Sequence, residues 1–290
     1  MDNKNFIIYV PDRPLKNGII GLWKEIFREM LDSRSLTWYF FLRDFKGSYG
    51  QSLLGIGWAF LVPFATLLTF IIMQASNILN VGDIGAIPYP IYALLGMSFW
   101  QLFVTCLGRG TTSLTSAGSM IKKLNFPREP LVFASLGVGL IPFLLQIGVV
   151  LFLIIFSGFI WPGQAVIPHW QIFLLPLFLI PILLLSCGFS FLLSIINVIM
   201  RDVGRAIPLG LTFLLFITPI GYTTSETSVI GTLARYNPLF YLCVGPRDMI
   251  LTGSTDFTLG FVLSFALSVF IFFFCWMAFH LAKDKVPERL

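Results

Sequence analysis

The stretch WPGQAVIPHW, Trp161–Trp170, lies inside a segment without Asp, Glu, Lys or Arg that runs from Pro130 to Met200. One membrane-spanning helix needs about 20 apolar residues. The uncharged segment is therefore too long for one crossing and long enough for two with a short return. Pro and Gly in the quoted stretch favour a turn, and its two Trp are typical of the membrane–water interface. We predict spanning helices at about 131–157 and 171–198.

The composition of the whole chain agrees with a membrane protein. Of its 290 residues, 57% are hydrophobic and 11% are charged, whereas a soluble domain carries roughly 25% charged residues. The mean hydropathy is +0.87. Further uncharged segments predict four more crossings, at about 53–75, 90–110, 206–223 and 257–282. The sequence thus predicts an all-α membrane protein with six transmembrane helices in one domain, 51–290, after an N-terminal segment, 1–50.

The cations predict the orientation of these helices. They follow the second, fourth and last crossings, as Lys122, Lys123, Arg128, Arg201, Arg205, Lys283, Lys285 and Arg289. The opposite loops, about 76–89 and 158–170, contain none. Because cytoplasmic loops are enriched in Lys and Arg, we expect both termini in the cytoplasm. The outer connection 224–255 is half apolar and broken by Gly and Pro, which predicts short re-entrant helices; an ordinary outer loop is the alternative.

The N-terminal segment contains an amphipathic pattern, GLWKEIFREMLD, Gly21–Asp32. Its apolar side chains fall on one helical face and its charged side chains on the other, which predicts a helix lying in the lipid headgroup layer. A soluble helix packed on a partner is the alternative. Arg43 and Lys46 follow and would lie near lipid phosphates. They either anchor the protein or bind the headgroup of a lipid-borne substrate.

Several function classes are disfavoured. The chain contains no G-x-x-x-x-G-K-[ST] loop, so it does not hydrolyse ATP by that route. The four cysteines form no C-x-x-C pair, and we expect them to be buried apolar residues rather than metal ligands or disulfides. A polyprenyl-phosphate glycosyltransferase would need neighbouring acidic residues, whereas Asp83, Glu226, Asp248 and Asp256 are isolated. An ion channel would need rings of polar residues, which are scarce in the predicted spans.

Four stretches resemble one family. RDFKGSYGQSLLGIGWAFLVP, Arg43–Pro63, resembles the start of the first span in membrane subunits of type-2 ABC exporters, except that Ser48 stands where many relatives carry Arg. The matching positions are Arg43, Asp44, Lys46, Tyr49, Ser52, Leu53, Gly55, Trp58 and Pro63. SMIKKLNFPREPL (119–131) is similar to the family's cytoplasmic loop, INVIMRDVGRAIP (196–208) to its Asn-x-x-x-Arg-Asp turn, and YNPL (236–239) to its outer segment. The nearest subgroup exports lipid-linked polysaccharides: O-antigen, capsule and teichoic acid.

The resemblance implies a transport subunit of a bacterial cytoplasmic membrane and not an enzyme. Two copies would form a homodimeric channel, driven by two copies of a separate ATPase subunit that binds ATP and Mg. No cofactor on this chain and no nucleic-acid partner are expected. The implied substrate is undecaprenyl-diphosphate-linked polysaccharide, most simply O-antigen; a drug or small-lipid exporter of the same superfamily is the alternative. The ATPase would dock on the loop 116–129, at Ser119, Met120, Lys122, Lys123, Asn125, Phe126, Pro127 and Arg128.

Two sets of residues would meet the substrate. Arg43, Lys46 and Arg109 are candidates for binding the pyrophosphate or headgroup, although Arg109 alternatively only extends toward the interface. Aromatic faces can stack on sugar rings, and the resemblance makes five residues candidates for the channel lining: Trp58, Phe60, Phe99, Trp100 and Tyr222. Packing against lipid or within the protein core is the alternative for each of these five.

Overall fold

A computed structural model describes residues 18–50, 57–76, 84–85, 87–222, 228–255 and 257–283. Within these ranges every regular element is a helix. The helices are α1 (Gly18–Asp32), α2 (Arg34–Tyr49), α3 (Gly57–Ala75), α4 (Tyr89–Ser116), α5 (Gly118–Lys123), α6 (Glu129–Ile155), α7 (Ser157–Ile160), η1 (Trp170–Leu174), α8 (Leu175–Ile199), α9 (Val203–Ile217), α10 (Val229–Tyr236), α11 (Pro238–Thr252) and α12 (Thr258–Ala282). The all-helical class predicted from composition is confirmed.

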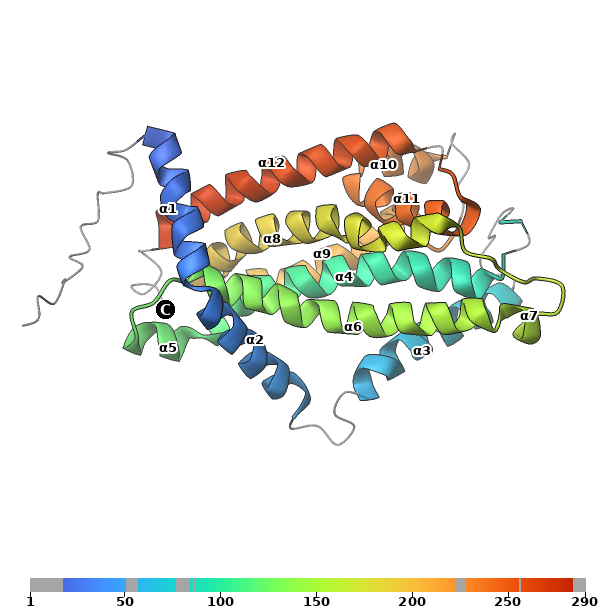
Figure 1. Cartoon of the computed structure of the whole chain (residues 1–290), viewed down its shortest axis with the longest axis horizontal. Coiled ribbons are helices and arrows are strands. Elements are labelled where there is room, and N and C mark those ends of the chain that lie inside the picture. Colours follow the sequence, from blue (N-terminus) through green and yellow to red (C-terminus); the bar gives the residue numbers. More distant parts are fainter. Residues whose placement is uncertain are drawn as a thin grey trace, which may run out of the picture.

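Helix α4 forms the centre of the bundle. It packs against α6 and α8, and α8 in turn packs against α12, so these helices run side by side (Figure 1). Small residues allow the close approach. A Cβ added at Gly110 would lie 2.1 Å from Ser190 Oγ, and one added at Gly188 would lie 2.9 Å from the Phe272 Cα. Such small-residue contacts are how helices associate in lipid, where apolar side chains alone give little preference.

Four helical segments are long and apolar enough to cross a membrane: Tyr89–Lys123, Glu129–Ile155, Trp170–Ile199 and Thr258–Ala282. They correspond to the second, third, fourth and sixth predicted crossings. Helix α4 continues to Ser116, beyond the predicted end at residue 110, and so carries Arg109 within its length. The central part of the predicted topology therefore agrees with the structure, while the first and fifth crossings stay predictions.

Helix α9 differs most from the sequence prediction of 206–223. It has 15 residues and ends at Ile217, which at about 1.5 Å per residue gives roughly 22 Å, less than the 30 Å of hydrocarbon. Pro219 follows the end of the helix and has no N–H to continue the bonding pattern. The residues after Ile217 therefore leave the helix, so α9 is shorter than the predicted crossing, which stays a prediction.

The two ends of the bundle carry different elements. Helix α1, helix α5 and the last described residues of the chain gather at one end, and α7, α10 and α11 lie toward the other (Figure 1). The loops predicted to share the cytoplasm are thus at the same end of the molecule. Which side of the membrane this end faces stays a prediction from the cations.

Helix α1 is amphipathic, as predicted, and part of its apolar face packs on its own chain. Leu22 and Ile26 are buried, and the Trp23 ring meets Phe273 and Trp276 of α12 edge-on, with centroids 5.2 and 6.0 Å apart. Other apolar side chains of this helix stay exposed: Phe27 and Leu31 are 41% and 61% accessible. The helix is therefore docked on α12 and still presents an apolar edge.

The outer connection forms two short helices, as its Gly and Pro content predicted. Asn237 separates them: its Oδ1 accepts from the Leu239 N–H at 3.0 Å and caps α11, while its Nδ2 donates to Thr218 Oγ1 at 2.6 Å. Helix α11 ends at Gly253, whose φ of 79° is the left-handed conformation that favours glycine. These bonds hold α11 against the end of α9. The depth of both helices in a bilayer stays a prediction.

Candidate functional site

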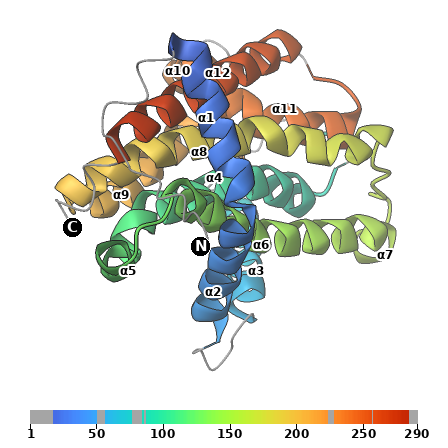
Figure 2. The same ribbon diagram turned by 60° about the vertical axis from the view of Figure 1, so that its left-hand side comes forward.

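The predicted ATPase-docking loop forms a short helix at one end of the bundle. Helix α5 follows α4 after a break at Ala117 and lies apart from the long helices, as Figure 2 shows. Its exposed residues are Ser119, Lys122 and Lys123, and Asn125 is exposed just beyond it. These residues give the loop a basic, accessible surface that a partner protein can contact.

The rest of the predicted docking set turns inward and fastens the loop. Arg43 donates to the half-buried Met120 sulfur at 3.7 Å, and the Phe126 ring lies 5.4 Å from Phe40 of α2. Arg128 is 8% exposed and donates to the backbone oxygen of Lys283. Arg128 therefore anchors the loop to the end of α12 and does not present its guanidinium to a partner. Pro127 is half-buried beside it.

A basic groove of about 680 Å³ lies beside α5. It is lined by Thr112, Thr115, Ser116, Gly118, Ser119, Lys122, Asn197, Arg201, Gly204 and Arg205. Asn197 connects two parts of the groove lining: its Oδ1 accepts from the Gly204 N–H at 2.8 Å, and its Nδ2 donates to Thr115 Oγ1 at 3.2 Å. The Asn-x-x-x-Arg-Asp turn thus fixes the start of α9 against the end of α4.

The three predicted headgroup cations are not in one cluster. Arg43 pairs with Asp44 at 2.7 Å and covers the Phe40 ring at 4.9 Å, so it is already engaged. Arg109 donates to Ser48 Oγ at 3.1 Å, which links α4 to the end of α2. Lys46 is exposed two residues before Ser48. The Arg109–Ser48 bond therefore places Arg109 near the segment that carries Lys46, whereas Arg43 bonds Met120 of the docking loop.

The predicted channel-lining aromatics separate into two groups. Phe99 and Trp100 are 0% and 3% exposed, and Phe99 packs 5.7 Å from Phe143. Their burial inside the protomer does not support a role in lining a channel. Trp58 is 49% exposed and Tyr222 is half-buried. The Phe60 side chain lies outside the described residues.

A buried arginine at the outer end was not among the predicted site residues. Arg247 is 2% exposed, its guanidinium lies 3.8 Å from the Tyr92 ring centroid, and its Nε donates to Asp248 at 2.8 Å. It also donates to the backbone oxygen of Ile220. A pocket of about 150 Å³ lies beside it, lined in part by Tyr92, Tyr222 and Asp248. The sequence signal was a cation in a half-apolar stretch whose only cations are Arg235 and Arg247, and such a cation marks a functional or structural ion in a membrane protein.

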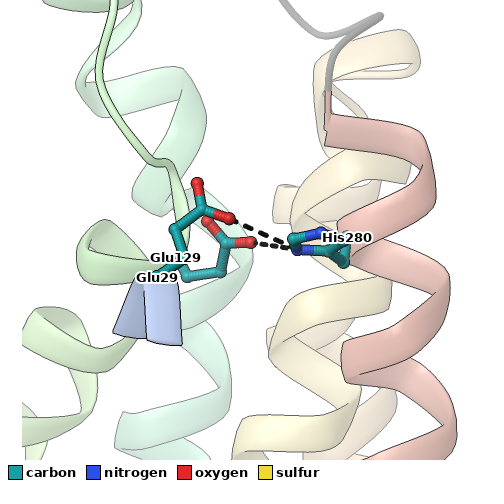
Figure 3. A group of neighbouring side chains, drawn as sticks. All are labelled: Glu29, Glu129 and His280. Atoms are coloured by element: carbon teal, nitrogen blue, oxygen red, sulfur yellow. Dashed lines mark hydrogen bonds and ion pairs between the residues drawn. The ribbon is translucent and has the colours of Figure 1, made fainter. Parts of the chain in front are cut away.

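A second unpredicted group joins three helices at the α5 end (Figure 3). We call Glu29, Glu129, His280 and Lys283 the charge cluster. Lys283 Nζ donates to Glu29 at 2.6 Å and to Glu129 at 2.8 Å, and His280 Nδ1 lies 2.9 Å from Glu129. A carboxylate only accepts, so Nδ1 carries the proton. These residues lie far apart in sequence, and no local pattern could have paired them.

Electrostatics keep Lys283 charged. Burial lowers the pKa of its ammonium group, but the carboxylates of Glu129 and Glu29 outweigh this and raise the pKa above its usual value. A raised pKa stabilises the fold at every pH below the unfolded value of about 10.4, and this contribution is lost only as the pH rises through the folded pKa. The Lys283 ammonium therefore stays charged across the physiological range.

The charge cluster also has the donor types of a metal site. Ligand atoms of Glu29, Glu129 and His280 lie within 4.8 Å of one another. However, the Lys283 ammonium already bonds both carboxylates, and a divalent ion beside it would be repelled. The residues fit an ion-pair cluster better than a metal centre.

Comparison with known proteins agrees with this arrangement. The family model described as ABC-2 type transporter matches residues 35–251. The chain is 26% identical over 224 residues to an O-antigen export system permease protein of Myxococcus xanthus, covering 75% of this chain and 80% of that protein. It is also 26% identical over 227 residues to one from Klebsiella pneumoniae, covering 77% and 83%. The chain therefore belongs to the ABC-2 type transporter family, as a non-enzymatic permease component and a multi-pass protein of the bacterial inner membrane.

Proposed function

We propose that this chain is the membrane half of an exporter that moves undecaprenyl-diphosphate-linked polysaccharide, specifically O-antigen, across the inner membrane. One observation carries the proposal: similarity to permeases named for O-antigen export spans at least 80% of their length. It also covers 75–78% of this chain and is therefore not limited to one motif. Family membership implies an ATP-binding partner subunit, and we propose two copies of it.

The exposed surface of α5 is the proposed contact for the ATPase. Its lysines and Asn125 are accessible, and the loop joins α4 directly on one side and α6 on the other. Because both are long helices of the bundle core, a push on α5 would reach the transmembrane region through rigid elements. The bonds of Arg43 and Arg128 at the two ends of the loop keep it from yielding locally.

A second copy of the chain is proposed to complete the channel. Within one protomer the centre is filled by α4, packed on α6 and α8, and this leaves the polymer path to run between protomers. Helices α3 and α9 present apolar side chains outward, including Trp58, Phe64, Phe213 and Phe216. We propose that these faces meet the second copy or line the channel, with Trp58 and Tyr222 against sugar rings. Lys46 and Arg109 are the proposed partners of the pyrophosphate.

Deletion of the gene tests the proposal. Cells without the protein are expected to accumulate lipid-linked polymer on the cytoplasmic leaflet and to lose it from the surface, and a plasmid copy is expected to restore export. Normal surface O-antigen in the deletion strain would overturn the proposal. Loss of capsule or teichoic acid instead, with O-antigen intact, would reassign the substrate.

A further inference from the structure

The charge cluster lies where the docking loop ends, and two consecutive residues there, Arg128 and Glu129, bond Lys283. Arg128, the last residue of the loop, donates to the Lys283 backbone oxygen, and Glu129, the first residue of α6, accepts from the Lys283 side chain at 2.8 Å. The end of α12 is thus held at its main chain and at its side chain. All three residues are at most 8% exposed.

The same lysine extends the connection to α1. Lys283 Nζ donates to Glu29 at 2.6 Å, and His280, one turn earlier on α12, places Nδ1 3.7 Å from the same carboxylate. Figure 3 shows both carboxylates, one from α1 and one from α6, pointing at His280. Helix α1 is also attached to α12 by the Trp23 packing described above. Helices α1 and α12 therefore form one unit at this end.

The charges favour a specific connection between these helices over a nonspecific attachment. Within the cluster the Lys283 ammonium pairs with both carboxylates, those of the buried Glu129 and the half-buried Glu29. A buried charge without its partner is strongly unfavourable, and the members therefore keep their positions relative to one another. Coupling between distant sites needs a contiguous network of this kind that biases a movable element.

Two features give the unit room to move. A groove of about 570 Å³ lies beside it, between α1, the start of α2 and Pro127 of the loop. Glu129 Oε2 is buried and has no hydrogen-bond partner among the residues that the structure describes. An acceptor without a donor is one that a shifted arrangement of the cluster can use. The observed bonds thus suit one of two states of a joint.

We propose that the charge cluster is the joint through which displacement of the docking loop moves α1 and the end of α12 together. This inference rests on the proposed function, because the loop must be driven by an ATPase. Glu29 is then a positioning residue: it carries the displacement to α1, whose exposed Phe27 and Leu31 form an apolar edge suited to the lipid surface. ATP-driven movement at the loop would then reach this apolar edge of α1.

The test compares two substitutions on α1. Glu29→Ala removes the only α1 carboxylate of the charge cluster, and Glu25→Ala, one turn earlier at an exposed position, is the matched control. Each variant is purified with its ATPase and assayed for assembly, ATP hydrolysis and export of lipid-linked polymer. We expect Glu29→Ala to assemble and hydrolyse ATP within twofold of the wild type and to export at least fivefold less per ATP hydrolysed. Glu25→Ala should match the wild type in all three.

Export per ATP separates coupling from stability, since a merely structural loss lowers every readout in proportion to folded protein. Unchanged export per ATP in Glu29→Ala would overturn the inference and leave the proposed function intact. If Glu29→Ala reduces the folded amount, Glu29→Gln, which keeps the size of the side chain and removes the negative charge that pairs with Lys283, is compared instead, and wild-type export per ATP in that variant would overturn the inference. Failure of the wild-type chain to assemble with the ATPase or to export polymer would overturn the proposed function itself.

Discussion

Replacing Arg247 with methionine is expected to destabilise the outer end of the bundle severely. The guanidinium is 2% exposed, bonds the Ile220 oxygen and Asp248, and lies 3.8 Å from the centroid of Tyr92. Methionine fills the space of the arginine side chain only as far as Nε, so the effect of Arg247→Met reports the lost polar contacts together with the space that the guanidinium leaves. The Ile220 carbonyl and the Asp248 carboxylate both lose their partner.

The lost contacts give the expected decrease in the free energy of unfolding. A hydrogen bond from a charged donor contributes about 1.5–3 kcal/mol, and a desolvated cation–π contact contributes about 2 kcal/mol. The Asp248 pair is discounted because that carboxylate is 21% exposed. Methionine recovers part of the contact with Tyr92, which leaves a net loss of about 3 kcal/mol in the free energy of unfolding. With roughly 2–4 °C per kcal/mol, the melting temperature should fall by roughly 6–12 °C.

The assay is thermal unfolding of the detergent-purified protein, followed by intrinsic fluorescence. Arg235→Met is the control, because Arg235 is an exposed cation on the neighbouring helix α10, and exposed substitutions usually change stability by less than about 0.5 kcal/mol. A melting temperature for Arg247→Met within about 2 °C of the wild type would refute the reasoning. Arg247→Lys should be intermediate, because an ammonium keeps the charge and lacks the planar fork.

Three further outcomes follow from the packing and the docking loop. Gly188→Ala should lower the melting temperature clearly, since its new Cβ would lie 2.9 Å from the α12 backbone, whereas Gly148→Ala meets nothing within 4 Å and should leave it unchanged or slightly raised. Asn197→Ala removes two bonds that join α4 to α9 and should destabilise the protein by about 2 kcal/mol in denaturant unfolding. Lys122→Glu with Lys123→Glu should reduce co-purification of the ATPase at least tenfold, and the double Gln variant should be intermediate; equal recovery of all three would exclude α5 as a basic contact.

The sequence predicted the long helices well because a single property decides them. Residues 130–200 contain no charged side chain, and only helices whose backbone groups are all bonded are stable in lipid at that composition. The predicted 131–157 and 171–198 lie within two residues of Glu129–Ile155 and of Trp170–Ile199 at each end. Hydropathy indicates where such helices occur; charged residues mark the two ends of the segment, and Pro and Gly in 161–170 mark the return between the helices.

Composition could not predict the end of α9. The residues on both sides of Ile217 are uncharged, so the uncharged segment continues where the helix does not. The turn depends on Pro219 and on two distant contacts, the Asn237 bond to Thr218 and the Arg247 bond to Ile220. A local pattern predicts a helix boundary only when local chemistry decides it, and here tertiary bonds from α11 contribute.

The residues of the candidate site likewise divide into those that the local sequence predicts and those that depend on distant contacts. Exposure of Lys122 and Lys123 follows from their position in a short polar loop, whose docking role was implied by the family resemblance. The inward turn of Arg128 was not, because its partner is 155 positions away at the end of α12. Trp100 was grouped with the channel aromatics since a sequence does not show which face of α4 meets α6 and α8.

The cations at the α5 end of the bundle illustrate why one residue can have two roles. Arg128 and Lys283 were counted toward the orientation of the chain, yet both are buried and bonded in the folded protein. The positive-inside preference acts on loops as the helices insert, before residues 128 and 283 can meet. The same charged side chains can then form bonds with each other when α6 and α12 pack together. Orientation therefore depends on the number of cations near each span, whereas the charge cluster depends on which side chains are present and how far they extend. A Lys283→Gln variant should keep the topology and lose the joint. Reversed label accessibility of the loop at 116–129 in that variant would contradict this separation of roles.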